Sequence, residues 1–208
     1  APVDGLAANS ATPMHTAASS GHAEAVRLLA EGGAFLEAAT KDRGSTPLHH
    51  AAGCGRIDVI RALVECGANL EAMTAEGERA LHVAARKGLP EVLSALLRAR
   101  ADPEAAMFDG RKALHFCARA GLIACAQVLL DAQASLEATD RRGFTPLHYV
   151  VHYGRSELGA ELVKRGAEVK AKTLQGTTVV DMAEKTGRAD LLRIFLDCAT
   201  PDFVDFEP

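Results

Sequence analysis

The sequence has no tryptophan and few other large aromatic side chains. Aromatic residues make up 4% of its 208 residues, while apolar residues make up 48% and charged residues 24%. This balance favours a folded chain over a disordered one. A single compact core of this size normally uses more large rings, whereas layers of Ala, Leu and Val need fewer because their helices pack closely. We therefore expect closely packed helices.

The longest apolar runs fall far short of the roughly 20 residues that a membrane-spanning helix needs. The N-terminus shows no charged segment followed by an apolar one, so no secretory signal is visible. The formal net charge of -4 argues against a broad basic surface for nucleic acids. We expect a cytoplasmic protein, with the nucleus as the alternative, that binds neither membranes nor nucleic acids.

Five cysteines occur, and none of them belongs to a CxxC pair. An odd number without paired spacing argues against a disulfide framework and fits a reducing compartment. Cys117 and Cys125 occupy positions where small apolar residues recur, which predicts two buried thiols.

A tetrapeptide recurs along the chain at a nearly constant interval. Thr-Pro-Leu-His occurs twice, Thr-Pro-Met-His once, and weaker copies fill the remaining places. The copies begin at Thr12, Thr46, Arg79, Lys112, Thr145 and Thr178. These starts are 34 residues apart once and 33 residues apart four times, and a glycine follows each start nine residues later. So many coincident registers indicate a repeat protein.

This pattern resembles the ankyrin repeat, which has a period of 33 residues and the signature T-P-L-H-x-A. The resemblance covers roughly residues 7–198. It implies an all-α fold, an α-solenoid in which each unit is a β-turn or hairpin followed by two antiparallel helices. The implied repeats are approximately residues 7–39, 41–73, 74–106, 107–139, 140–172 and 173–200. They would form an ankyrin-repeat domain over residues 1–200, followed by an acidic tail at 201–208.

Five histidines share one position of the repeat, namely His15, His49, His82, His115 and His148. A shared metal is a poor interpretation, because packed helices lie about 8–10 Å apart whereas zinc holds its nitrogens at about 2.0–2.1 Å. The ankyrin resemblance implies instead that each ring bonds to loop backbone. The sequence also has no nucleophile elbow, metalloprotease helix or phosphate-binding loop. We therefore expect neither metal, nor cofactor, nor catalysis.

By the same resemblance, partner contacts fall on the turn before each first helix and on the two residues before its closing glycine. In repeats three to five these positions combine basic and aromatic side chains, which binding hot spots favour. The predicted partner-binding residues are Arg86, Lys87, Phe108, Arg111, Arg119, Arg141, Arg142, Phe144, His152 and Tyr153. They would form a basic groove on the concave face that holds an acidic or amphipathic segment of another protein.

Two other interpretations stay open at this stage. The cations could serve only solubility while the rings pack on neighbouring turns. The chain could also be a regulatory or targeting segment of a larger enzyme or channel. In the leading interpretation the isolated chain is a monomeric protein-interaction scaffold.

Repeats three and four depart from the pattern. Arg100 and Gln133 replace the glycine that closes the second helix, and a left-handed backbone there would cost each about 1–2 kcal/mol. Arg79 and Lys112 replace the threonine that begins the first helix, which puts a cation where the helix dipole disfavours it. We predict that these two repeats are the softest internal part of the stack.

The two ends of the array differ in sequence. Residues 7–10 replace a turn that normally ends in glycine, which predicts an array that extends further toward the N-terminus. Residues 189–198 mix apolar and charged side chains in the manner of a closing repeat. The tail at 201–208 is expected to pack on the last helix, or alternatively to dock onto another protein.

Overall fold

The computed structural model describes the backbone of residues 10–199. These residues fold into helices that follow one another in antiparallel pairs, without any strand. The helices are α1 (Pro13–Ser20), α2 (Ala23–Glu31), α3 (Pro47–Gly53), α4 (Ile57–Glu65), α5 (Ala80–Lys87), α6 (Pro90–Arg98), α7 (Ala113–Ala120), α8 (Ile123–Asp131), α9 (Pro146–Tyr153), α10 (Ser156–Lys164), α11 (Val179–Lys185) and α12 (Ala189–Ala199). The predicted all-α solenoid of stacked repeats is confirmed. The predictions for residues 1–9 and for the tail at 201–208 lie outside the described residues.

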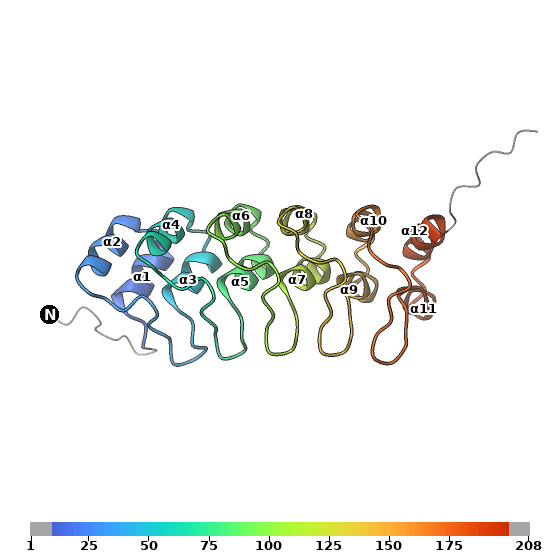
Figure 1. The fold of residues 1–208 in the computed structure, drawn as a ribbon, viewed down its shortest axis with the longest axis horizontal. Coiled ribbons are helices and arrows are strands. Elements are labelled where there is room, and N and C mark those ends of the chain that lie inside the picture. Colours follow the sequence, from blue (N-terminus) through green and yellow to red (C-terminus); the bar gives the residue numbers. More distant parts are fainter. Residues whose placement is uncertain (1–9, 200–208) are drawn as a thin grey trace, which may run out of the picture.

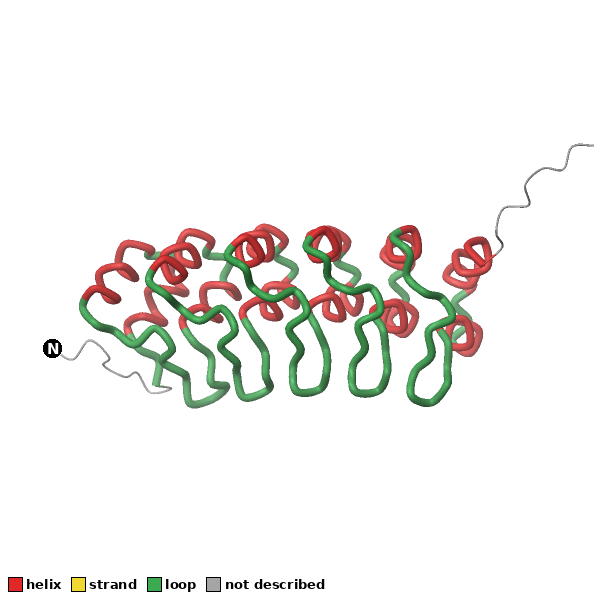
Figure 2. The backbone as a smooth tube through the Cα atoms, in the orientation of Figure 1, coloured by secondary structure: helices red, strands yellow, loops and turns green. Residues whose placement is uncertain are grey.

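The helices form two rows (Figure 1). The odd-numbered helices make one row and the even-numbered helices make the other, and each helix contacts its counterpart in the next repeat. Figure 2 shows that the long loops project from the odd-numbered row, on the side away from the even-numbered helices. The described residues contain no helix that is long and apolar enough to cross a membrane.

The core is a continuous layer between successive repeats. One apolar position of the second helix is fully buried in five repeats: Leu63, Leu96, Leu129, Leu162 and Phe195 are each 0% exposed. Small side chains line the first helices, which lets neighbouring helices approach closely. Cys117 and Cys125 belong to this core at 0% and 1% exposure, so the predicted burial of both thiols is confirmed.

The shared histidine joins each repeat to the loop of the next. The N–H of Thr46 donates to Nδ1 of His49 at 3.2 Å, and Nε2 of the same ring lies 2.9 Å from the carbonyl oxygen of Glu78. Because Nδ1 accepts, the ring proton sits on Nε2 and is donated to that carbonyl. The rings of His15, His115 and His148 lie 3.0–3.3 Å from the equivalent carbonyl oxygens, which are those of Ser45, Phe144 and Thr177. The ring of His82 instead lies 2.9 Å from the carbonyl oxygen of Ala105, which is earlier in the loop before α7. The predicted backbone role of this histidine is confirmed.

The turn that follows each second helix requires a left-handed residue. Gly67 adopts φ 92° there, whereas Arg100 and Gln133 adopt φ 73° and 67° in the equivalent turns. The turn therefore keeps its geometry without glycine, and each of these residues carries the strain of a side chain in the left-handed region.

Carboxylates offset the two cations that begin the first helices of repeats three and four. The guanidinium of Arg79 lies 2.7 Å from the carboxylate of Glu71, and Nζ of Lys112 donates to Glu104 at 2.6 Å. Glu104 also accepts the backbone N–H of Ser135 at 2.8 Å. A glutamate from the preceding loop thus neutralises the cation near the helix N-terminus and bonds the next repeat as well.

Candidate functional site

The C-terminal ends of the first helices of repeats four and five meet through a cation and a ring. Cζ of Arg119, on α7, lies 5.4 Å from the ring centroid of Tyr153, on α9. Tyr153 in turn stacks on Tyr149 at 6.2 Å with 21° between the ring planes, and the ring of His152 meets its edge at 4.8 Å. Arg119 and His152 are exposed, and Tyr153 is 36% exposed, so this group forms part of the surface.

A pocket of about 460 Å³ opens beside this pair. Side chains from three successive repeats line it: Arg86, Phe116, Arg119, Ala120, Tyr153 and Arg155. We call this set the arginine pocket. Of the ten residues predicted from the sequence, the structure brings Arg86, Arg119 and Tyr153 together here. The pocket places three guanidinium groups around two aromatic rings, an arrangement that suits a carboxylate or another anion.

Arg155 was missed by the sequence analysis. Its Nε donates to the carbonyl oxygen of Arg119 at 3.1 Å, which satisfies an acceptor near the end of α7. Arg56 makes the same bond to the carbonyl of Ser19, at 2.9 Å. The signal was an arginine directly after the glycine that closes a first helix, as in Gly154-Arg155. The side chain of Arg155 reaches back one repeat because Gly121, which closes the first helix of the preceding repeat, leaves room for it: a Cβ on Gly121 would lie 3.0 Å from Cδ of Arg155.

Three of the predicted cations pair with carboxylates of the same repeat. Arg86 donates to both oxygens of Glu78, Arg111 donates from Nε to Asp109 at 2.6 Å, and Nε of Arg142 lies 3.3 Å from Asp140. These pairs cancel much of the positive charge that the sequence suggested along repeats three to five. Arg119 and Arg155, by contrast, have no ion pair with any carboxylate of residues 10–197.

Asp140 organises the loop before α9. Its Oδ1 accepts the N–H groups of Arg142 and Phe144 at 2.8 and 2.9 Å, and its Oδ2 accepts the hydroxyl of Tyr149 at 2.9 Å. Burial alone would raise the pKa of this carboxyl, but the hydrogen bonds from Phe144, Arg142 and Tyr149 outweigh burial and hold the pKa below its usual value. Burial and the bond to Asp140 raise the pKa of Tyr149 to about 12. The ring stack that carries Tyr153 is therefore anchored at its buried end.

The two predicted phenylalanines differ in exposure. Phe108 is 52% exposed at a loop tip and covers Gly77 of the preceding loop, where an added Cβ would lie 2.9 Å from the ring atom Cδ1. Phe144, by contrast, is half-buried. Its ring lies 5.5 Å from that of His148 and 4.4 Å from Cζ of Arg142. The ring of Phe144 also packs against the apolar core.

Lys87 and Arg141 complete the predicted set. Both are exposed, and neither has an ion pair with a carboxylate of residues 10–197. Neither side chain lines the arginine pocket. Each adds positive charge to the same repeats, and the backbone N–H of Arg141 donates to the carbonyl oxygen of Asp109 at 3.0 Å.

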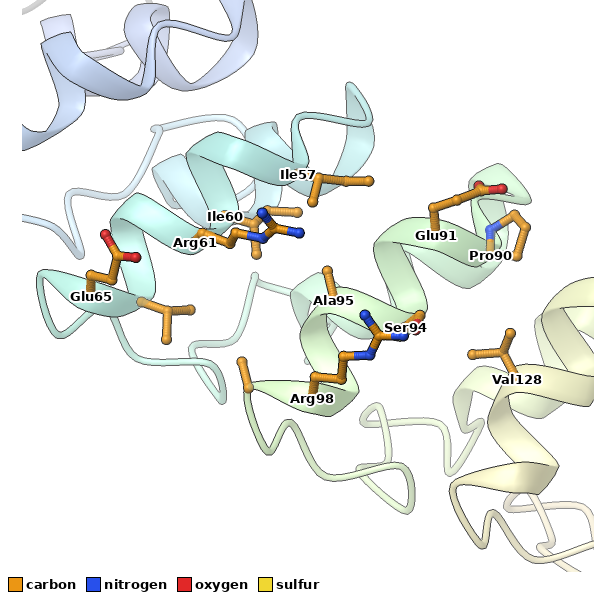
Figure 3. A pocket seen from close by; sticks show the side chains of 12 residues that line it. Ile57, Ile60, Arg61, Glu65, Pro90, Glu91, Ser94, Ala95, Arg98 and Val128 are labelled. Atoms are coloured by element: carbon orange, nitrogen blue, oxygen red, sulfur yellow. The ribbon is translucent and has the colours of Figure 1, made fainter.

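A second hollow, of about 560 Å³, lies on the even-numbered row between α4 and α6 (Figure 3). Ile57, Ile60 and Ala95 are among its apolar lining residues, and Arg61 and Arg98 stand on its two sides. None of the ten predicted residues lines it. Within the described residues, no three metal-ligating side chains are grouped closely enough to hold an ion.

Comparison with known proteins identifies the family. A model of ankyrin repeats (3 copies) matches residues 2–74 and again residues 69–140, and a model of ankyrin repeats (many copies) matches residues 128–183. No curated protein sequence matches the chain. The crystal structure of the ankyrin repeat domain of Bcl-3, a unique member of the IkappaB protein family, is similar with a TM-score of 0.85 and 31% sequence identity. That similarity covers 92% of this chain and 87% of that chain. Ankyrin repeats are generally protein–protein interaction modules, and catalysis is not a property of the repeat. The chain belongs to the ankyrin-repeat family.

Proposed function

We propose that the chain binds an acidic segment of a partner protein on the face formed by the odd-numbered helices and their loops, with the arginine pocket at the centre of the contact. The observation that carries this proposal is that Arg119 lies against Tyr153 at the edge of this pocket, with no carboxylate of residues 10–197 to neutralise it. A partner carboxylate would supply the missing counter-ion. The ring of Tyr153 would meanwhile bury apolar surface of the partner.

Charge and rigidity both support this choice of face. Arg155 adds a second guanidinium that has no ion pair with a carboxylate of residues 10–197, while Glu78 already holds Arg86 and fixes that side of the pocket. A preformed site loses little conformational entropy on binding, because its side chains are already ordered. The remaining predicted residues, Lys87, Phe108, Arg111, Arg141, Arg142, Phe144 and His152, would flank this centre.

The test is the double variant Arg119→Glu with Tyr153→Ala. Both side chains are exposed, so the fold should persist and the circular dichroism spectrum should be unchanged. Partner proteins are first captured from native lysate with the unmutated protein, and acidic peptides are derived from them. Both should bind the double variant at least ~30-fold more weakly than they bind the unmutated protein.

Arg98→Glu is the matched control, because it makes the same charge change on the even-numbered row. It should bind as tightly as the natural sequence. Equal weakening by both variants would point to a general charge effect, and undiminished binding by the double variant would overturn the proposed site.

A further inference from the structure

Two arginines of the arginine pocket keep unused hydrogen-bond donors. Nε of Arg155 donates to the carbonyl oxygen of Arg119, while the two terminal amino groups of Arg155 bond to none of residues 10–197. The guanidinium of Arg119 makes no hydrogen bond with these residues either, and lies over the ring of Tyr153 instead. Both arginine side chains are exposed, so their N–H groups are available to a ligand.

The charge of the pocket depends on which of its arginines are paired. Glu78 neutralises Arg86, whereas Arg119 and Arg155 have no ion pair with a carboxylate of residues 10–197. The remaining lining residues carry no charge at neutral pH: Phe116, Ala120 and Tyr153. The pocket therefore presents two uncompensated positive charges, which come from two adjacent repeats.

A phosphate monoester matches this charge and these donors better than a carboxylate does. It carries about −1.5 to −2 charges at pH 7 and has three terminal oxygens that accept hydrogen bonds. A carboxylate carries one charge on two oxygens, which leaves one of the two guanidinium groups without a counter-ion. A planar guanidinium also binds phosphate oxygens in pairs while it stacks on an aromatic ring, and Arg119 already lies over such a ring.

The surroundings of the pocket favour a single phosphate over a nucleic-acid strand. Each phosphodiester of a nucleic acid carries only one negative charge, and tight binding depends on many cations along the strand. On the same face, Arg111 is paired with Asp109 and Arg142 is paired with Asp140. These pairs interrupt a basic track along the repeats, whereas the pocket concentrates two charges at one point.

We propose that the arginine pocket binds a phosphorylated side chain in the partner segment, with the phosphate between Arg119 and Arg155. Carboxylates are weaker ligands of the same site, because each neutralises only one of the two guanidinium groups. The proposal rests on the proposed function, since the phosphate belongs to the same partner segment. Phosphorylation of the partner would then set the strength of its binding.

The test compares two capped amino acids, N-acetyl-phosphoserine amide and N-acetyl-glutamate amide, as ligands of the full chain at neutral pH. Their binding is measured by NMR through the Nε–H signals of Arg119 and Arg155. We expect the phosphoserine probe to bind at least ~10-fold more tightly than the glutamate probe. Arg119→Gln and Arg155→Gln should each weaken phosphoserine binding by at least ~5-fold. Because Arg119 makes no side-chain hydrogen bond within residues 10–197, its variant keeps the test decisive even if Arg155→Gln disturbs the end of α7.

Arg98→Gln is the matched control, because Arg98 is exposed, has no ion pair with residues 10–197 and lies on the even-numbered row. It should leave the binding of both probes unchanged. Equal affinity for the two probes, or equal weakening by Arg98→Gln, would overturn the proposal. Dimethyl phosphate, a singly charged diester, binding as tightly as phosphoserine would assign the pocket to a nucleic-acid backbone, with the same consequence.

The captured partners separate this proposal from the proposed function. Partners that lose binding to the Arg119→Glu, Tyr153→Ala double variant, together with equal affinity for the two probes, would overturn the phosphate assignment alone. A clear preference for phosphoserine, together with undiminished partner binding by that double variant, would overturn the proposed function and the phosphorylated partner with it.

Discussion

Arg86 forms a bidentate hydrogen bond with the carboxylate of Glu78, in which Nε lies 2.9 Å from Oε1 and Nη2 lies 3.2 Å from Oε2. Arg86 lies at the end of α5 and Glu78 lies in the loop before it, so the pair fixes the loop against its own helix. The Glu78 side chain is only 12% exposed, whereas that of Arg86 is 39% exposed. Arg86 is thus a structural element of the arginine pocket as well as a source of charge.

This geometry predicts a measurable coupling between Arg86 and Glu78. In a double-mutant cycle with Arg86→Met and Glu78→Gln, we expect a coupling free energy of about 1–2 kcal/mol in urea unfolding, because each single change leaves the other charge without its partner. Arg193 and Asp197, 3.9 Å apart with side chains 86% and 72% exposed, form the control pair. Their coupling should stay below about 0.5 kcal/mol. Equal couplings for the two pairs would contradict the prediction.

The stack should lose stability as the pH falls from neutral. Burial lowers the pKa of His82 from its usual value to about 4, although the hydrogen bond to the Ala105 carbonyl opposes the shift. Burial also lowers the pKa values of His49, His115 and His148. Below about pH 6.5 these histidines therefore bind protons in the unfolded chain but stay neutral in the folded chain. As a result, the unfolding free energy declines between about pH 6.5 and 4.

For His82 alone, this linkage amounts to about 2 kcal/mol between pH 7 and 5. The measurement is urea unfolding at a series of pH values for the natural sequence and for His82→Asn. The variant should be less stable at pH 7, yet its stability should decline less steeply toward pH 5. Parallel curves for the two proteins would refute the assignment.

Glycine should be the better residue at two turns. Arg100→Gly and Gln133→Gly should each raise the unfolding free energy by ~1 kcal/mol, since both residues are exposed and occupy left-handed backbone. Gly67→Ala, in the equivalent turn of repeat two, is the reciprocal control and should lower it by a similar amount. Denaturant unfolding of the three variants measures these changes in the unfolding free energy. A loss of stability in both Arg100→Gly and Gln133→Gly would contradict the prediction.

Repeats three and four remain predicted to be the softest internal part of the stack. One reason for the lower stability, the strained turns at Arg100 and Gln133, is present in the structure. The second reason, a cation at the start of the first helix, is offset because Glu71 and Glu104 neutralise Arg79 and Lys112. Amide exchange should therefore be faster in α5 to α8 than in α3 and α4, but by less than the sequence alone suggests. Exchange in α5 to α8 as slow as in α3 and α4 would disprove it.

The sequence by itself determined the architecture. A period of 33 residues places Pro146 at the start of a helix and Gly154 at its end, and such local preferences act within a few residues. The same register identified the histidines that bond the next loop, because one role recurs at one position. It also located the surface on which Arg119 and Tyr153 meet.

Only the tertiary structure decided which cations are unpaired and which residues share the pocket. Arg86 and Arg142 pair with carboxylates in their own loops, and Arg155 reaches the carbonyl of Arg119 from 36 residues away. Stacking brings together residues about one repeat apart, and each pairing then depends on side-chain lengths and rotamers in two neighbouring units. A one-dimensional pattern records the register of the repeats but not these contacts between them.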